Sequence, residues 1–238
     1  MIAEEEGKIY GVEGYIPMNG EEMPDICGAL WKVIPCNYFM LGKSIRDLKE
    51  YHIAVIGDKT VRALGSENDV GRLEYVNSFE EMDRYLSEEY LKTKVPYKDK
   101  VYLRYRYFEH PVYKYDVYAI VQPKRRSFVV MREVSVNQAK IGKIVDFIGE
   151  DEDLAGLCAA WDELMEEKGY EFIDIYSYGI PERIMEQSGF KKLAEEENII
   201  PNYFEPFEAK NVEIYFVSNV LKGLHLYRGD GDQDRPSV

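Results

Sequence analysis

Cations and aromatic rings alternate in the segment Arg104–Tyr115. Arginine binds phosphate through two parallel hydrogen bonds, and a tyrosine ring offers a flat surface for stacking. We therefore expect Arg104, Arg106 and Tyr107, together with Arg132, to bind substrate in a groove for a sugar or a nucleotide phosphate. The alternative is an amphipathic strand whose arginines bury their aliphatic stems and keep their charges in water.

His110 lies in the same segment, and the ordinary pKa of histidine is close enough to neutrality for a general base. We take His110 as the candidate catalytic residue. The alternative is a loop residue, because His110 precedes Pro111. The other two histidines, His52 and His225, fall on expected strands, and we interpret both as structural.

Carboxylates gather in the stretch Asp230–Asp234, which resembles the opening of a calcium-binding loop. The glutamate expected at the twelfth loop position is missing and Pro236 intervenes, so an EF-hand is excluded. We expect a solvated acidic tail and no metal site. The alternatives are contacts with an amine or hydroxyl acceptor, or ion pairs with Arg132 or Arg235.

Asp146 and Asp174 each lie within an apolar run. An unpaired carboxylate is costly in an apolar environment. We therefore expect each of them to pair with Arg132 or Lys143, or to point to solvent.

The elements that position these residues are clearest in Ile141–Leu193. An apolar strand, Ile141–Gly149, precedes an amphipathic helix within Leu154–Met165, and a second strand follows at Phe172–Tyr176. A short helix at Pro181–Gln187 leads through a Ser-Gly-Phe sequence into another strand. A crossover helix between two buried strands predicts a locally parallel pair, and hence an α/β or α+β fold. The expected apolar face of the first helix consists of Leu154, Leu157, Trp161, Leu164 and Met165.

This unit resembles the second half of the GNAT fold, the acyl-CoA N-acyltransferase superfamily. In that family the helix after the fourth strand leads into the fifth strand, and a short helix closes on a Gly-Phe pair before the sixth. The matching residues are Phe172–Tyr176, Glu182–Gln187 and Gly189-Phe190. An unrelated βαβαβ unit is the alternative.

The order of elements in Tyr115–Leu193 repeats that of Lys8–Phe79. The earlier stretch has expected strands and helices at Lys8–Met18, Ala29–Pro35, Ile45–Glu50 (helix), His52–Gly57, Asp58–Leu64 (short helix) and Gly71–Phe79. The chain is therefore similar to two tandem GNAT-like mixed β-sheet units with flanking helices. Similar pairs occur in the Fem peptidyltransferases and in acyltransferase-like proteins of bacterial surface-polysaccharide clusters.

The expected domains are residues 1–79, 80–100 and 101–238. The first is an N-terminal GNAT-like unit that lacks the usual first strand and helices. The second is a connecting helix, Glu80–Lys94, that ends before Pro96. The third is a C-terminal GNAT-like unit with the acidic tail. Either the front of the first unit is missing from the chain, or a second protomer or a partner protein supplies it.

The resemblance also implies a binding site for acyl-CoA. GNAT enzymes bind the CoA pyrophosphate at a helix start with the pattern Gln/Arg-x-x-Gly-x-Gly/Ala, where free N–H groups and small residues accept phosphate. The equivalent place in the first unit precedes the helix expected at Ile45–Glu50. A helix start without a ligand is the alternative. The candidate cofactor-binding residues are Asn37, Met40, Leu41, Gly42, Lys43 and Ser44.

In the second unit, four consecutive acids, Glu150–Asp153, stand at the equivalent place. Their charge repels pyrophosphate, so this unit is not expected to bind CoA in the usual way. The structural interpretation of these acids is capping of a helix start and interaction with its dipole.

The chain has 238 residues, 45% of them hydrophobic, and a formal net charge of −14. Such a charge argues against a nucleic-acid or membrane-surface binder, because both partners are anionic. No apolar run is long enough to span a membrane. The three cysteines lack metal-site spacing and are typical of reduced thiols in a cytoplasmic protein.

These observations lead to two expectations of function. The first is an acyl-CoA-dependent N- or O-acyltransferase that acts on a small amino-sugar or surface-glycan precursor, with acetyl-CoA or another acyl-CoA as co-substrate. The second is a non-catalytic GNAT-like protein that binds a ligand or a partner enzyme.

Overall fold

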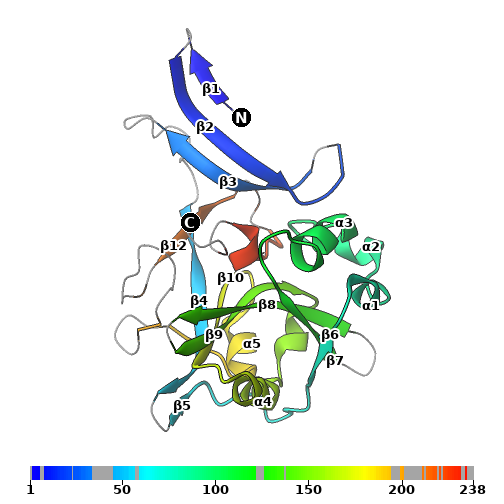
Figure 1. Cartoon of the computed structure of the whole chain (residues 1–238), viewed down its shortest axis with the longest axis vertical. Helices are drawn as coiled ribbons and strands as arrows, with labels where there is room; N and C mark the ends of the chain where they lie inside the picture. The colour runs from blue at the N-terminus through cyan, green and yellow to red at the C-terminus, as the bar shows by residue number, and fades with distance from the viewer. Residues whose placement is uncertain are drawn as a thin grey trace.

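The computed structural model describes residues 2–5, 8–22, 24–33, 45–56, 59–121, 126–136, 138–193, 199–200, 211, 213–218, 220, 222–231 and 234. These residues form a mixed structure with a large curled sheet, a small separate sheet and few helices (Figure 1). The expected mixture of helices and strands is therefore confirmed at the level of an α+β fold.

The small sheet is antiparallel, with strand order β1-β2-β3. Its strands are β1 (Ile2–Glu5), β2 (Lys8–Pro17) and β3 (Ile26–Val33). It projects from the rest of the molecule in Figure 1. Strand β2 confirms the strand expected at Lys8–Met18, and β3 overlaps the one expected at Ala29–Pro35.

The large sheet contains ten of the described strands, with a main order of β11-β4-β10-β9-β8-β7-β6. Strands β6 to β9 form an antiparallel meander, β10 is parallel to β9, and β4 is antiparallel to β10. The bounds are β4 (Ile45–Ile56), β5 (Lys59–Val61), β6 (Leu73–Val76), β7 (Asp116–Val121), β8 (Arg126–Val136), β9 (Ala139–Ile148), β10 (Phe172–Tyr178), β11 (Lys191–Lys192), β12 (Ile214–Val217) and β13 (Leu226–Tyr227).

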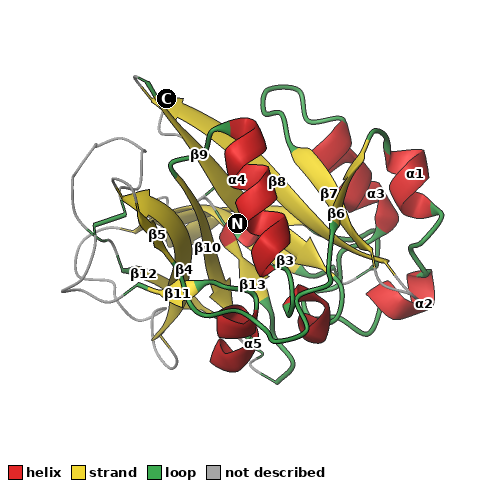
Figure 2. Ribbon diagram, turned by 90° about the horizontal axis from the view of Figure 1, so that it is seen from below, coloured by secondary structure: helices red, strands yellow, loops and turns green. Residues whose placement is uncertain are grey.

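Helices cover both faces of this sheet (Figure 2). One group is α1 (Phe79–Asp83), α2 (Glu88–Leu91) and α3 (Lys100–Leu103), which continues into a π-helical turn, Arg104–Phe108. The other group is α4 (Cys158–Lys168) and α5 (Glu182–Gln187). Single 3₁₀ turns occur at Asp151–Leu154 and Arg228–Asp230.

Alternate side chains of the central strands supply two cores, as the pleat of a strand requires. In β8, Val129 and Met131 pack with residues of α4 and α5. Their neighbours Phe128 and Val130 pack on the opposite face with residues of α1, α2 and α3. The five residues expected on the apolar face of the helix that became α4 are all buried, although Leu154 and Leu157 precede its first turn.

The predictions of two helices in the earlier half of the chain are wrong. Ile45–Glu50 is the first half of strand β4, and Asp58–Leu64 contains strand β5. Strand β4 pairs with β10 along one edge, with β5 and β11 along the other, and with β12 through its first four residues. This pairing outweighs a local pattern that is compatible with a helix.

The single helix expected at Glu80–Lys94 is also wrong, because the chain forms α1 and α2 there. Ser78 and Ser87 each cap one helix, and the Ser87 hydroxyl accepts a hydrogen bond from the Tyr90 N–H at 3.3 Å. A second N-cap serine starts a second helix with its own acidic first turn.

The large sheet joins strands from both sides of the expected connecting segment. Strands β4 and β6 precede residues 80–100, and β7 to β10 follow them, yet all belong to one sheet. The expected arrangement of two tandem units is therefore not confirmed by the sheet topology.

Candidate functional site

Strands β9 and β10 separate at a bulge. They pair in parallel up to Ile144 and Ile175. On the other side of β9, Met131 lies opposite Ile144 but Val130 lies opposite Asp146, so β9 has one extra residue between these pairs. A bulge bends its strand and increases the local twist. The two parallel strands therefore diverge toward their carboxyl ends.

The space between them is filled by a late segment of the chain, residues 224–231 and 234, which we call the insert segment. Strand β13 pairs antiparallel with β10 through Tyr227 opposite Ser177. The chain then passes so close to β9 that a Cβ atom on Gly229 would lie 2.9 Å from the Val145 carbonyl oxygen. Position 229 therefore requires glycine, because any side chain would clash with β9 at this crossing.

The first buried ionic cluster of the insert segment centres on Lys98. Its Nζ lies 2.7 Å from Oδ1 of Asp146 and 2.6 Å from Oδ1 of Asp230. The Tyr107 hydroxyl donates to the other Asp146 oxygen at 2.5 Å, and the Tyr227 N–H donates to Asp230 at 2.8 Å. Burial raises the pKa of Asp230 to about 6, against the lowering effect of Lys98.

The second cluster centres on Asp234. Arg106 Nη2 donates to its Oδ2 at 2.8 Å, and the Tyr115 hydroxyl donates to the same oxygen at 2.5 Å. Arg132 Nη1 lies 3.5 Å from the other oxygen. All four side chains are at least nine-tenths buried. Two guanidinium groups and one hydroxyl therefore converge on one carboxylate.

The third cluster joins β4, β9, β10 and the insert segment. Oδ2 of Asp174 lies 2.9 Å from Lys143 Nζ and 2.9 Å from Arg228 Nη2. The Arg228 guanidinium also lies over the Tyr176 ring at 4.2 Å from its centroid. Burial, and then the Asp174 charge, raise the pKa of Glu50 to about 7.

These clusters correct the expected acidic tail. Asp230 and Asp234 are buried in ion pairs and are not solvated. The expected alternative of a pair with Arg132 is confirmed for Asp234, and the expected pair of Asp174 with Lys143 is confirmed. Asp146 pairs with Lys98, which the sequence reasoning did not consider.

An open groove of about 440 Å³ lies at the carboxyl end of β10, beside the insert segment. In sheets with parallel strands, ligands commonly bind at this end, and ligand pockets have volumes of about 300–1,000 Å³. The polar side chains of the lining include an exposed lysine, two tyrosines, a serine and a histidine. The lining residues are Lys49, Tyr51, Ser177, Tyr178, Gly179, Ile180, Gly223, Leu224 and His225.

His225 stands between this groove and a smaller cavity of about 50 Å³. Its Nε2 lies 3.1 Å from Oδ2 of Asp151, and its Nδ1 lies 3.2 Å from the Gly223 carbonyl oxygen. Both neighbours are acceptors, so both contacts are satisfied together by the doubly protonated ring. The hydrogen bond to Asp151 raises the pKa of His225. These contacts favour the protonated form of His225.

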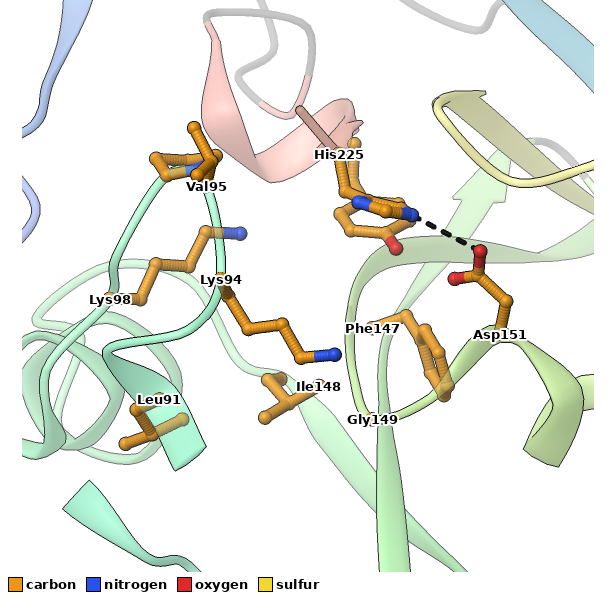
Figure 3. Close-up of a pocket in the computed structure, with 11 residues that line it drawn as sticks. Leu91, Lys94, Val95, Lys98, Phe147, Ile148, Gly149, Asp151 and His225 are labelled. Atoms are coloured by element: carbon orange, nitrogen blue, oxygen red, sulfur yellow. Dashed lines mark hydrogen bonds and ion pairs between the residues drawn. The ribbon is translucent and has the colours of Figure 1, made fainter. Parts of the chain in front are cut away.

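Figure 3 shows the smaller cavity, with His225 and Asp151 facing each other at one side. Lys94 extends toward the cavity from the chain between α2 and α3, and its Nζ lies 2.8 Å from Glu150 Oε1. A volume of about 50 Å³ is close to that of one or two water molecules. The larger groove is therefore the better candidate for a substrate.

The expected substrate-binding residues fall into two groups, three that are buried and one that is exposed. Arg106, Tyr107 and Arg132 are buried around the aspartates of the clusters described above. Arg104 is exposed and its Nε donates to Glu109 at 2.6 Å. These four residues line neither of the two hollows described above.

His110 lies in a turn after the π-helical segment. Its Nδ1 accepts hydrogen bonds from the N–H groups of Val112 at 3.2 Å and Tyr113 at 2.9 Å, and its ring stacks on that of Tyr113. These contacts fit the loop interpretation. His110 is absent from the lining of the groove.

The candidate cofactor-binding residues, Asn37, Met40, Leu41, Gly42, Lys43 and Ser44, lie outside the described residues. The helix that was expected to follow them is replaced by strand β4. The argument that a helix N-terminus would bind phosphate at this place is therefore lost.

The four acids that precede α4 are engaged by other parts of the chain. Glu150 pairs with Lys94, Asp151 with His225, and Asp153 with the Ser127 hydroxyl. Glu152 lies 4.0 Å from Arg183. Their structural role extends beyond the capping expected from the sequence.

Sequence reasoning missed the groove residues Lys49, Ser177 and His225. They come from β4, β10 and the insert segment, which are far apart in the chain. The polar ends of two strands and a lone histidine carry no shared spacing, so no sequence signal grouped them.

Comparisons of the chain with protein-family models and with curated proteins give no match. Within the described part of the chain, no helix has the length and apolar character needed to cross a membrane. The same residues contain no group of three or more His, Cys, Asp or Glu side chains arranged to hold a metal ion.

Proposed function

We propose that the chain is an acyl-CoA-dependent acyltransferase of the GNAT type, acting in the cytoplasm on a small amino-sugar or related surface-glycan precursor. Two observations carry the proposal: the parallel pair β9 and β10 diverges at a bulge, and a ligand-sized groove lies at the carboxyl end of β10.

The order of elements also supports the resemblance, with one change from the expected division. A complete GNAT unit begins with a strand and helices, and β6 with α1, α2 and α3 provides such a start before β7. Strands β7, β8 and β9 then precede α4, β10 and α5, and Gly189-Phe190 leads into β11. The unit that resembles the family thus begins at β6, ahead of the expected boundary at residue 101.

The groove supplies groups suited to a polar substrate. The Lys49 ammonium offers positive charge, and the hydroxyls of Ser177 and Tyr178 can donate or accept hydrogen bonds. The apolar part of the lining, including Ile180 and Leu224, suits an acyl chain or a sugar ring face.

In the proposed reaction, an acceptor amine or hydroxyl attacks the carbonyl carbon of the thioester. A C–N or C–O bond forms, the C–S bond breaks, and the acceptor proton passes to a general base while the CoA thiolate leaves. Backbone N–H groups polarise the carbonyl in such transfers. His225 is not the general base in this proposal, because acceptors occupy both of its ring nitrogens.

The second candidate is a non-catalytic protein of the same type that binds a ligand or a partner enzyme. One observation favours it: the insert segment fills the space between β9 and β10, and its pairing with β10 is antiparallel. The negative charge of the acids 150–153 before α4 also disfavours a pyrophosphate there. In this candidate a second protomer or another protein would supply the catalytic groups.

Isothermal titration with acetyl-CoA tests the proposal on the wild type and on three variants. Lys49→Glu reverses a charge in the groove, and Gly42→Glu tests the segment 37–44. Lys92→Glu is the matched control, since Lys92 is exposed and pairs with Glu21 at 3.3 Å away from the groove. We expect Lys49→Glu to weaken binding about tenfold or more, roughly 1.4 kcal/mol, and Lys92→Glu to leave it unchanged.

Absence of binding at millimolar acetyl-CoA would contradict the acyltransferase proposal for this chain. Binding that only Gly42→Glu abolishes would place the cofactor at residues 37–44 and refute the groove as its site. Transfer that appears only when another protein is added would support the second candidate.

A further inference from the structure

The insert segment places its carboxylates against cations from distant elements. Asp230 contacts Lys98, which precedes α3, and Asp234 contacts Arg106 of the π-helical turn and Arg132 of β8. These contacts join the insert segment to Lys98, Arg106 and Arg132, which all lie more than 90 residues earlier in the chain.

The surroundings of Asp234 have an excess of positive charge. Two guanidinium groups face a single carboxylate, and the Tyr115 hydroxyl adds a third donor to the same oxygen. Arginine forks match the oxygens of phosphate as well as those of carboxylate. A phosphate carries more negative charge than a carboxylate and has at least one more acceptor oxygen, so it can accept from two guanidinium groups and a hydroxyl together.

We propose that Arg106 and Arg132 form a phosphate-binding site, which the Asp234 carboxylate occupies in this structure, and that a phosphate-bearing ligand enters it by displacing the insert segment. The inference does not rest on the proposed acyl transfer, because an inorganic anion is sufficient to test it.

The insert segment is held mainly by its buried ion pairs, because its backbone pairing with the sheet is short. Its only strand, β13, has two residues and pairs with the end of β10, and the rest is a single 3₁₀ turn and an irregular stretch. Leu224 and His225 also line the open groove. Movement of the segment away from β9 would therefore connect the groove with the buried cations.

The charge that the segment leaves behind favours an anion. Without Asp230 and Asp234, the cations Lys98, Arg106, Arg132 and Lys143 would face Asp146, Asp174 and Glu50. Buried positive charge in excess is unfavourable unless an anion compensates it. The ligand would thus provide the charge that the aspartates now provide.

The first test is thermal unfolding of Asp234→Ala in sodium phosphate and in sodium chloride at equal ionic strength. The variant lacks the carboxylate and keeps both arginines. We expect it to melt roughly 6–12 °C below the wild type in chloride and to recover at least half of that loss in phosphate. The wild type should gain much less from phosphate. If the variant is unfolded in chloride, the proposal predicts instead that phosphate restores its folded circular dichroism spectrum.

Two controls identify the site. The double variant Arg106→Gln, Asp234→Ala should lose most of the phosphate effect. Asp83→Ala breaks an exposed pair with Lys100 and should respond to phosphate as the wild type does. A phosphate effect of equal size in the wild type, in the double variant or in Asp83→Ala would overturn the proposal.

The second test follows the wild type directly. Hydrogen exchange of peptides that cover residues 224–234 is measured with and without inorganic pyrophosphate. We expect faster exchange in the insert segment with millimolar pyrophosphate, while β8 and β9 stay protected. An unchanged exchange rate in the insert segment would refute its displacement. Because this test uses the wild type, it also decides the proposal if Asp234→Ala is unfolded in both salts.

Discussion

Asp234 accepts a hydrogen bond of 2.8 Å from Arg106, a residue 128 positions earlier in the chain. The carboxylate is fully buried and the arginine is nine-tenths buried. Removal of one partner from a buried pair commonly costs about 3–5 kcal/mol, because the other charge remains without compensation. The late segment of the chain is thus held in the sheet by charge as well as by packing.

Lys98→Met should destabilise the protein by about 3–5 kcal/mol at neutral pH. The change leaves Asp146 and Asp230, both buried, without the ammonium that each contacts. Urea unfolding monitored by circular dichroism measures the loss.

Lys100→Met is the matched control for this variant. Lys100 pairs with Asp83 at 2.6 Å, but both side chains are about one-third exposed or more. Its loss should be about 1 kcal/mol or less. Equal losses for the two lysines would show that the Lys98 cluster is not buried as described.

Gly229→Ala should destabilise the protein by about 1–3 kcal/mol. The added Cβ would lie 2.9 Å from the Val145 carbonyl oxygen and 2.9 Å from the Tyr107 hydroxyl. Gly231→Ala, two residues later, meets nothing within 4 Å and should be nearly neutral. Chemical denaturation compares the two; a neutral Gly229→Ala would mean that the insert segment does not cross β9 closely.

Glu50 should make the folded state less stable as the pH rises. Its pKa is raised from 4.5 to about 7, so between these values the folded chain binds more protons than the unfolded chain. Its contribution to stability is complete below about pH 4.5 and is lost as the pH passes through about 7. At about 1.4 kcal/mol per pKa unit, this amounts to about 3 kcal/mol.

Urea unfolding of the wild type and of Glu50→Gln across this pH range isolates that contribution. The stability of the wild type relative to the variant should fall as the pH rises, since the glutamine does not titrate. Parallel pH profiles for the two proteins would refute a buried, proton-binding Glu50.

Asp151→Asn should lower the pKa of His225, since the hydrogen bond with Asp151 is the largest cause of its raised pKa. Lys94→Gln should shift it the opposite way, because the Lys94 charge lowers the pKa of His225. NMR titration of the His225 ring protons measures this pKa in both variants. A decrease in both, or no change in Asp151→Asn, would contradict the placement of His225 beside Asp151.

The strands and helices of the later half were largely predictable from the sequence. Strands β7, β8 and β9 are each built around an apolar run, and α5 spans the expected Glu182–Gln187. The sequence also agrees with the end of α4. The residue that caps it, Gly169, has a φ of 70°, a value that glycine adopts readily. Local pattern is sufficient where burial follows the period of the element.

Strand β4 was not predictable by the same means. Ile45 and Leu48 are three residues apart with charged residues between them, which is compatible with a helix. The structure makes this stretch a strand because β12 pairs with Ile45–Leu48 and β10 pairs with the residues that follow. These partners lie more than 100 residues away, so no local window contains the information.

The candidate site was predictable only in part. The sequence singled out Arg106, Tyr107 and Arg132 for their chemistry, and the structure gathers them around buried aspartates. The burial of Asp230 and Asp234 was not predictable, because a run of acids and glycines has the composition of a solvated tail. Only the folded chain brings Lys98, Arg106 and Arg132 together around these aspartates and makes their burial favourable.

A double-mutant cycle between Arg106 and Asp234 tests the central claim most directly. Urea unfolding at neutral pH is measured for the wild type, Arg106→Gln, Asp234→Asn and the double variant. If the two charges form a buried pair, the cycle should give a coupling of about 2 kcal/mol or more. Additive effects, with a coupling below about 0.5 kcal/mol, would contradict the insertion of Asp234 between the arginines.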